Sequence, residues 1–437
     1  MTMTLIDLEQ YQSIIQKTDI LRVVGKVIEI VGLVVVAEVQ GVSIGELCNI
    51  RINQAESMLA EVVGFKEGRV LLMPLGSTAG VRPGALIFAT GRPIEVKVGP
   101  KLLGRVLDGL GNPIDGLGEL EYETVYGVDN DPPDPISRPR ISEVMQTGVK
   151  AIDGMLTFGM GQRVGIFAGS GVGKSTLMGM LARNCSADVN VISLVGERGR
   201  EVKDFIEESL GEEGLKRSVV ICATSDQPPV IRMKGALVGT SVAEYFRDQG
   251  KNVLFMMDSV TRFAMAQREI GLATGEPPTT KGYTPSVFAM LPRLMERAGT
   301  SPKGSITAIY TVLVDGGDMD EPIADAARGI LDGHLVLSRD LAAKNHYPCI
   351  DVGHSVSRLF SVVANKSHQK AAGKCREILA RYTEAEDLIN IGAYVKGSNP
   401  KIDEAVSKID AVNKFLQQGT MEDCPFDKSI KTLTNLF

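Results

Sequence analysis

The sequence predicts an α/β protein: a parallel β-sheet flanked by helices, with a small β-barrel before it and a helical domain after it. Three observations support this prediction. Short apolar runs alternate with longer helical patterns over residues 147–360, as in a parallel sheet with helices on both faces. Residues 20–92 contain short β-branched runs separated by glycines, which is typical of a small closed barrel. Over residues 361–437 glycine and proline become rarer and long helical patterns follow.

Two further segments complete the predicted organisation. Residues 1–19 place apolar side chains near helical spacing, so we expect a short amphipathic helix there that could dock on a partner. Residues 93–146 are predicted to be a connector. Within them, residues 127–140 contain four prolines, which cannot continue a helix or a central strand.

Composition excludes several classes of protein. The 437 residues carry 47 basic and 53 acidic side chains, a net charge of −6, with 5% aromatic residues and no tryptophan. This balance argues against a nucleic-acid-binding surface, so no nucleic-acid partner is expected. The six cysteines are scattered without a Cys-x-x-Cys pair, which predicts free thiols. There is no secretory signal pattern, and charges interrupt the most apolar stretch, residues 20–39, so no membrane span is expected.

The strongest local signal is a phosphate-binding loop over residues 168–176, between an apolar strand pattern and a helical pattern. Glycines let backbone N–H groups converge on phosphate oxygens, and the start of the helix adds favourable partial charge. Lys174 supplies a mobile positive charge, and the Ser175 hydroxyl can bind Mg²⁺. Ala168 stands where the strict pattern has glycine. The predicted nucleotide-binding residues of this loop are Gly169, Gly171, Val172, Gly173, Lys174, Ser175 and Thr176.

Two other strand ends carry residues suited to the same chemistry. Residues 253–257 form an apolar run that ends in Asp258, as expected for an acid that holds Mg²⁺ through water. Residues 191–195 form another buried strand, followed closely by Glu197 and Arg198. A carboxylate there can activate the attacking water, and a guanidinium can stabilise charge on the transferring phosphoryl group.

These motifs resemble a known family, the ATPases of flagellar and virulence type III export, which are similar to the catalytic subunits of rotary ATP synthases. The resemblance covers nearly the whole chain and implies a RecA-like P-loop ATPase core between the barrel and the helical domain. Its motifs are GQRVGIFAGSGVGKST, LVGERGREVKDF, VLFMMDSVTRFAMAQRE, GEPPTTKGYTPSVFAMLPRLMERAG, ILDGHLVLSRDLA and YPCIDVGHSVSRL.

The resemblance assigns roles around bound ATP and Mg²⁺. It implies that Lys174 and Ser175 are ligands of phosphate and Mg²⁺ respectively. It makes Glu197 the carboxylate that activates water and Arg198 a contact of the γ-phosphate.

It also assigns four residues outside the phosphate loop. Asp258 becomes the second acid at the Mg²⁺ site, and Arg262 lies near the nucleotide. Tyr347 matches the aromatic residue that stacks on adenine. Arg358 matches an arginine finger that reaches into the site of a neighbouring subunit.

The resemblance further implies a homohexamer at the inner face of the cell membrane. Because Glu197 and Arg358 belong to one chain, identical subunits could complete every site. The implied partners are a regulatory dimer on the N-terminal helix, a coiled-coil stalk in the central pore, an export gate, chaperones and export substrates. The stretch over residues 391–400 looks more like the flagellar branch than the virulence branch.

Four alternatives remain at this stage. A virulence secretion ATPase shares the motifs. A catalytic subunit of an ion-translocating synthase is disfavoured, because such rings pair a catalytic chain with a non-catalytic one. A ring-shaped RNA helicase is disfavoured because residues 20–90 contain only Phe65 and Phe88 as aromatic residues. Glu197 argues against a nucleotide-binding scaffold without activity.

Overall fold

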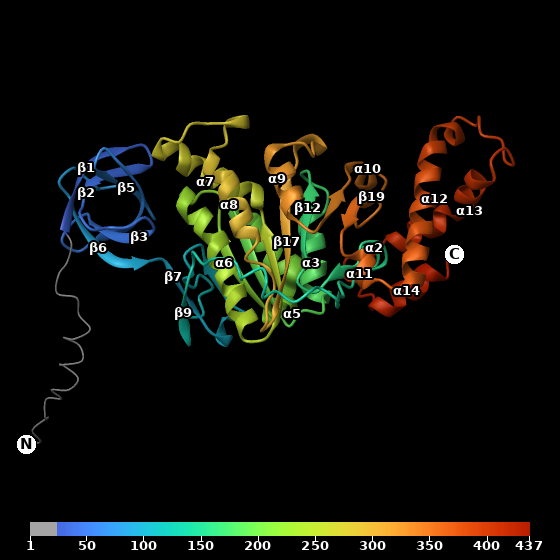
Figure 1. The fold of residues 1–437 in the computed structure, drawn as a ribbon, viewed down its shortest axis with the longest axis horizontal. Coiled ribbons are helices and arrows are strands. Elements are labelled where there is room, and N and C mark those ends of the chain that lie inside the picture. Colours follow the sequence, from blue (N-terminus) through green and yellow to red (C-terminus); the bar gives the residue numbers. More distant parts are fainter. Residues whose placement is uncertain (1–23) are drawn as a thin grey trace, which may run out of the picture. The chain divides into compact units, whose positions relative to one another are not determined.

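The computed structural model describes residues 24–437 and divides them into two compact units (Figure 1). The first contains the described residues up to Ile94 together with Ala273–Gly275. The second contains Glu95–Leu272 and Glu276–Phe437. The helix expected over residues 1–19 lies outside the described part of the chain.

The first unit contains a closed β-barrel with the strand order β1-β2-β5-β4-β3-β6. Positions alternate along the start of β1, since Gly25 and Val27 are buried while Val24 and Lys26 are exposed. Apolar side chains from the other strands fill the interior, among them Ile50 and Leu72. The six strands are β1 (Val24–Val31), β2 (Val34–Glu38), β3 (Glu46–Arg51), β4 (Ser57–Lys66), β5 (Arg69–Pro74) and β6 (Leu86–Pro93).

The second unit is built on a nine-stranded sheet in the order β19-β18-β12-β17-β15-β13-β14-β8, with β16 paired to β17. The pairs are parallel except those made by β16 and β19, which are antiparallel. The central strands are buried along their whole length, as parallel strands covered on both faces must be. The strands are β8 (Val106–Asp108), β12 (Arg163–Ala168), β13 (Val189–Val195), β14 (Ser218–Ala223), β15 (Asn252–Asp258), β16 (Gly299–Thr300), β17 (Ser305–Leu313), β18 (Gly333–Leu337) and β19 (Ile350–Ser357).

Helices connect the parallel strands. The connection from β12 to β13 is α3 (Lys174–Asn184), and that from β14 to β15 is α6 (Pro229–Asp248). Together with the sheet they form the expected α/β core. Between β13 and β14 lie α4 (Gly199–Asp204), the π-helical turn η2 (Phe205–Leu210) and α5 (Gly211–Lys216). The later connections contain α7 (Val260–Thr274), η3 (Thr280–Gly282), α8 (Pro285–Met295), η4 (Asp315–Gly317), α9 (Pro322–Ile330) and α10 (Arg339–Ala343).

The segment predicted as a connector also contributes to the sheet. Its strand β8 pairs in parallel with β14 at one edge, which the sequence did not indicate. The proline-rich stretch after it contains neither helix nor strand. Its start is held by Arg297, whose Nη1 donates to the carbonyl of Val128 over 2.7 Å. The other elements are η1 (Pro100–Leu102) and two small sheets, which pair β7 (Glu95–Val98) with β9 (Thr124–Gly127) and β10 (Val144–Met145) with β11 (Phe158–Gly159).

The C-terminal helices share one hydrophobic core with the central sheet. Their contact point is α2 (Lys150–Met155), where Phe415 packs so tightly on Gly154 that a Cβ there would lie 2.7 Å from its ring. Asn365 and Asn399 cap α12 and α13, because their side chains accept a backbone N–H of the first turn. The C-terminal helices are α11 (Phe360–Val363), α12 (Lys366–Asn390), α13 (Pro400–Leu416) and α14 (Phe426–Thr434).

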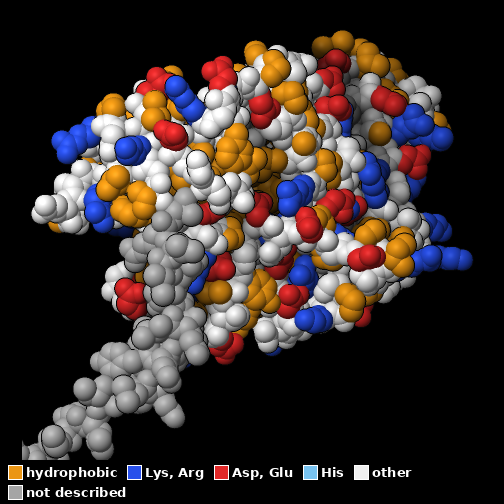
Figure 2. Space-filling view, turned by 60° about the vertical axis from the view of Figure 1, so that its left-hand side comes forward, with side chains coloured by type: hydrophobic (Ala, Val, Ile, Leu, Met, Phe, Trp, Pro, Cys, Tyr) orange, Lys and Arg blue, Asp and Glu red, His pale blue; other side chains and the backbone are white. Residues whose placement is uncertain are grey.

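The surface carries both signs of charge. On the face in Figure 2, acidic and basic side chains are interspersed, with small apolar groups between them. Among residues 24–437, no helix combines the length and the apolar character that crossing a bilayer would require.

Candidate active site

A cavity of about 520 Å³ lies at the ends of β12 and β13, where the phosphate loop and the Glu197 turn meet. Ligands of parallel α/β sheets bind at this edge, beyond the carboxyl ends of the strands. Most of the predicted site residues line it. The lining residues are Ala168, Gly169, Ser170, Gly171, Gly173, Lys174, Ser175, Thr176, Gly196, Glu197, Arg198, Glu201, Ser225, Arg262 and Leu313.

The phosphate loop has the backbone that its glycines predict. Gly171 and Gly173 have φ values of 79° and 81°, a left-handed conformation that favours glycine. Gly173 directly precedes α3, so the free N–H groups of the first turn are available to an anion at this end of the helix. Val172 differs from its neighbours because its side chain is buried in the core, which leaves only its backbone to face a ligand.

Three charged side chains meet at the inner end of the cavity. Lys174 Nζ lies 2.6 Å from Asp258 Oδ1 and 3.4 Å from Glu197 Oε1. Burial disfavours charge on Lys174, but the two carboxylates outweigh that effect and raise its pKa. Asp258 is buried and also accepts a hydrogen bond from Thr311 Oγ1 over 2.6 Å. Lys174 can therefore pair with an anion that enters the cavity in place of these two carboxylates.

Glu197 has the electrostatics of a base that works near neutral pH. Burial raises the pKa of this carboxyl from 4.5 to about 7, and the nearby negative charge of Asp258 adds to the rise. Lys174 acts in the opposite direction and lowers it. A carboxylate poised near pH 7 is suited to general base catalysis.

Two arginines border the cavity in different ways. Arg198 is largely exposed and its Nη1 pairs with Glu201 Oε1 at 3.1 Å. Arg262 packs against Gly196, where an added Cβ would come within 2.9 Å of its side chain. The Arg262 Nε is buried, and no hydrogen-bond partner for it occurs among the described residues. A buried N–H of a guanidinium without a partner favours an anionic ligand in the cavity.

Tyr347 lies beside the phosphate loop, although it is not part of the cavity lining. Its ring carbons Cδ1 and Cε1 would lie 4.0 Å from a Cβ on Gly173. The side chain is 43% exposed, so a large part of the ring is open to a planar ligand.

Arg358 does not lie at this site. It follows Ser357, which pairs with Gly333, the first residue of β18. The phosphate loop follows Ala168, which lies level with Leu337, the last residue of β18. At roughly 3.3 Å per residue, these levels are about 13 Å apart along the sheet. Arg358 therefore lies toward the opposite edge of the sheet from the phosphate loop of its own chain.

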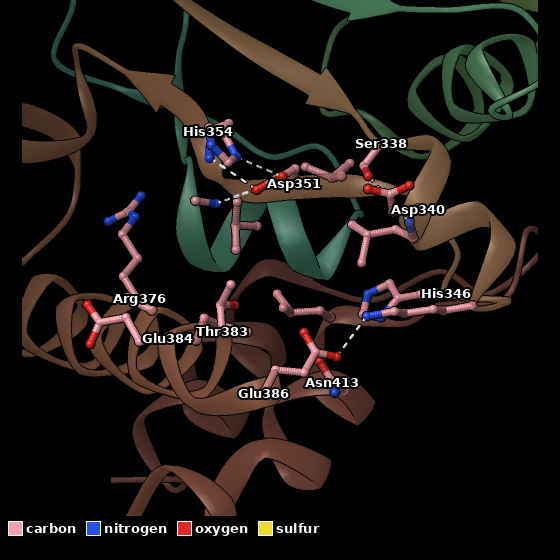
Figure 3. Close-up of a pocket in the computed structure, with 18 residues that line it drawn as sticks. Ser338, Asp340, His346, Asp351, His354, Arg376, Thr383, Glu384, Glu386 and Asn413 are labelled. Carbon is pink, nitrogen blue, oxygen red and sulfur yellow. Dashed lines mark hydrogen bonds and ion pairs between the residues drawn. The ribbon is translucent and has the colours of Figure 1, made fainter. Parts of the chain in front are cut away.

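A second cleft, of about 600 Å³, lies next to the Tyr347 segment (Figure 3). One wall carries Asp351 and His354 of β19, whose side chains pair at 2.8 Å, and the other is formed by α12. Lys344 Nζ and Glu386 Oε1 pair at 3.0 Å between the two walls. This cleft is larger than the phosphate-loop cavity, but it holds none of the predicted site residues.

Comparison with known proteins agrees with this geometry. The nucleotide-binding domain of the ATP synthase alpha/beta family matches residues 148–357, and its β-barrel domain matches residues 27–91. The C-terminal domain of the type III secretion ATPase EscN matches residues 364–435. The chain is 55% identical over 424 residues to the flagellum-specific ATP synthase of Bacillus subtilis, covering 97% of each chain.

The chain belongs to the flagellar and type III secretion ATPase family. A type 3 secretion system ATPase from Xanthomonas euvesicatoria is 54% identical, with 94% of this chain and 93% of the relative aligned. The solved structure of assembled EscN from enteropathogenic Escherichia coli superposes with a TM-score of 0.90 at 45% identity, covering 94% of this chain and 99% of EscN. This member of the family is accordingly a P-loop ATPase with the predicted three-part fold.

Two residues beside the export ATPase site were missed from the sequence. Thr311 of β17 holds Asp258, and Arg339 at the start of α10 lies against the phosphate loop, since a Cβ on Gly169 would be 2.8 Å from its Nη2. Both come from strand-end regions more than a hundred residues away from the phosphate loop. For Arg339, the only sign in the sequence was its place in the motif ILDGHLVLSRDLA.

Proposed function

We propose that this ATPase energises type III export of flagellar proteins as a homohexameric ring, in which Arg358 of each subunit completes the nucleotide site of a neighbour. The position of Arg358 carries this proposal. It lies too far along the sheet to serve its own phosphate loop, while every other proposed catalytic side chain lines or adjoins one cavity. A second copy of the chain is the simplest source of the missing guanidinium.

The proposed reaction is in-line attack of water on the γ-phosphate of ATP, which breaks the bond between the γ-phosphorus and the β–γ bridging oxygen and releases ADP and phosphate. The phosphate loop and Lys174 bind the phosphates, and Lys174 leaves its two carboxylates to do so. Glu197 then accepts a proton from the attacking water as its oxygen approaches phosphorus. Arg198 and Arg262 contact the γ-phosphate, and Arg358 of the neighbour stabilises the charge that develops on it.

The residues at the inner end of the cavity fit Mg²⁺. A serine hydroxyl and a buried carboxylate, Ser175 and Asp258, are the oxygen ligands that this ion prefers. Mg²⁺ would neutralise phosphate charge when bound with ATP. Thr311 keeps the Asp258 carboxylate oriented by donating a hydrogen bond to it.

We assign adenine recognition to Tyr347. The ring lies beside Gly173, which directly precedes α3, so a base extending from phosphates in the loop could stack on its exposed face. This assignment predicts that Tyr347→Ala weakens ATP binding without affecting a ligand that has phosphates only.

Two solved structures of a relative support part of the proposed set of partners. EscN has been solved both as an assembled ATPase and in complex with its central stalk EscO. We propose an equivalent coiled-coil stalk here, with a regulatory dimer on the N-terminal helix. Chaperones, export substrates and an export gate complete the set, at the inner face of the cell membrane. No nucleic-acid partner is proposed.

Mixing two inactive variants tests the shared site. Glu197→Gln lacks the base but offers Arg358, while Arg358→Ala lacks the finger but offers Glu197. In a randomly mixed ring, about a quarter of the interfaces combine both intact residues, so phosphate release should return to about a quarter of the wild-type rate. No recovery above the two variants alone would contradict completion of the site by a neighbour.

The export role is tested in cells that lack this chain. Flagellar filaments should be absent, and wild-type protein should restore them whereas Glu197→Gln should not. Normal filaments with simultaneous loss of virulence-type secretion would assign the chain to the other branch of its family.

A further inference from the structure

Gln418 lies just after α13 and is 6% exposed, yet every polar atom of its side chain is used. Its Nε2 donates to the carbonyls of Gly148 and Glu422, both over 2.7 Å. Its Oε1 accepts the backbone N–H of Lys150 over 2.8 Å. A buried amide with all these partners is fixed in one orientation. The Gln418 side chain therefore links the chain just after α13 to the start of α2.

The backbone of the same residue reaches the nucleotide side of the domain. The Gln418 N–H donates to the carbonyl of Tyr347 over 2.9 Å. Tyr347 in turn lies beside Gly173, the residue that precedes α3. A continuous path thus runs from the buried amide through one backbone hydrogen bond to the ring next to the phosphate loop.

An ion pair between the residues just before Tyr347 and the C-terminal helices is weak by comparison. Lys344 and Glu386 pair at 3.0 Å, but their side chains are 63% and 32% exposed. Exposed ion pairs contribute little to the position of a loop. The buried bonds of Gln418 are therefore the stronger restraint on where Tyr347 lies.

We propose that Gln418 is a positioning residue for adenine recognition: it holds Tyr347 at the edge of the phosphate loop, so the C-terminal helical region helps to select adenosine nucleotides. This inference rests on the proposed stacking role of Tyr347. It predicts an effect on binding of the nucleoside but not on binding of the phosphates, because Gln418 touches neither the phosphate loop nor the charged cluster.

The test compares a non-hydrolysable ATP analogue with inorganic tripolyphosphate, which lacks the nucleoside. Calorimetric titration of the full chain gives both dissociation constants for the wild type, Gln418→Met, Tyr347→Ala and the double variant. The exposed neighbour provides a matched control, Gln417→Met. Gln418→Asn, which keeps the amide, serves if Gln418→Met does not fold.

We expect Tyr347→Ala to weaken binding of the ATP analogue about 5- to 150-fold, the range for loss of one stacked base. Gln418→Met should weaken it about 3- to 30-fold, leave tripolyphosphate binding unchanged, and add little when combined with Tyr347→Ala. Gln417→Met should match the wild type for both ligands.

Other results would refute the role of Gln418 or the role of Tyr347. Equal weakening of both ligands by Gln418→Met, no weakening of either, or additive effects in the double variant would refute the positioning role of Gln418. If Tyr347→Ala binds the ATP analogue as well as the wild type does, the proposed stacking role of Tyr347 is wrong as well.

Discussion

The acid limb of the pH–rate profile should belong to Glu197. Its pKa is raised to about 7 in the ligand-free enzyme, mainly by burial, and kcat/KM reports groups of the free enzyme. Only the ionised carboxylate accepts a proton, so activity should fall as the pH decreases through 7. A group with this pKa is about one-eleventh ionised at pH 6 and about ten-elevenths at pH 8, so kcat/KM should rise about tenfold between them.

Glu197→Gln should lower kcat/KM about 10²- to 10⁴-fold, the usual range for loss of a general base. Its residual activity should lack the limb near pH 7, because the titrating group is gone. Phosphate release at constant ionic strength between pH 5.5 and 9 measures both effects. The matched control is Glu213→Gln, because Glu213 is an exposed carboxyl of α5 that pairs with Lys216 and is not among the groups that shift the pKa of Glu197.

Two observations would refute this reasoning. A limb near pH 4.5, the ordinary value for a glutamate, would mean that burial does not perturb Glu197 in solution. A limb near pH 7 that persists in Glu197→Gln would assign the titration to another group. Glu213→Gln should retain the wild-type profile.

Two further substitutions test the surroundings of the site. Thr311→Val should raise the Mg²⁺ concentration for half-maximal activity about 10- to 100-fold, because Asp258 loses its orienting bond; Thr307→Val, on the same face of β17, should not. Arg297→Met should lower the free energy of unfolding by about 3–5 kcal/mol in a urea titration, because it leaves the Glu244 carboxylate buried without its partner at 2.8 Å. Glu244→Leu added to Arg297→Met should recover part of that loss, and a double variant no more stable than the single one would contradict the explanation.

The phosphate loop, Glu197 and Asp258 could be predicted because each lies at the carboxyl end of a buried strand. Local sequence specifies strand, turn and helix start together, and parallel strands bring their carboxyl ends to one edge of the sheet. The order of the strands was not needed to predict that these residues meet.

Residues that act through tertiary contacts could not be predicted in the same way. Thr311 and Gln418 are ordinary side chains in sequence, and their partners Asp258 and Gly148 lie 53 and 270 residues away from them. The strand β8 was missed because three residues inside a long irregular segment carry no recognisable period. The level of Arg358 on the sheet depends on β19 running antiparallel to β18, which hydrophobic patterning does not specify.

The antiparallel direction of β19, which places Arg358 away from its own phosphate loop, has a consequence for how activity should depend on protein concentration. On the proposed assembly each contact is head-to-tail, so an open row of subunits always leaves one nucleotide cleft unfinished at its end. A pair completes only one of its two clefts, and closing the row into a circle completes the last. Turnover per subunit should therefore rise steeply as the protein concentration increases. It should reach its plateau only where closed circles predominate.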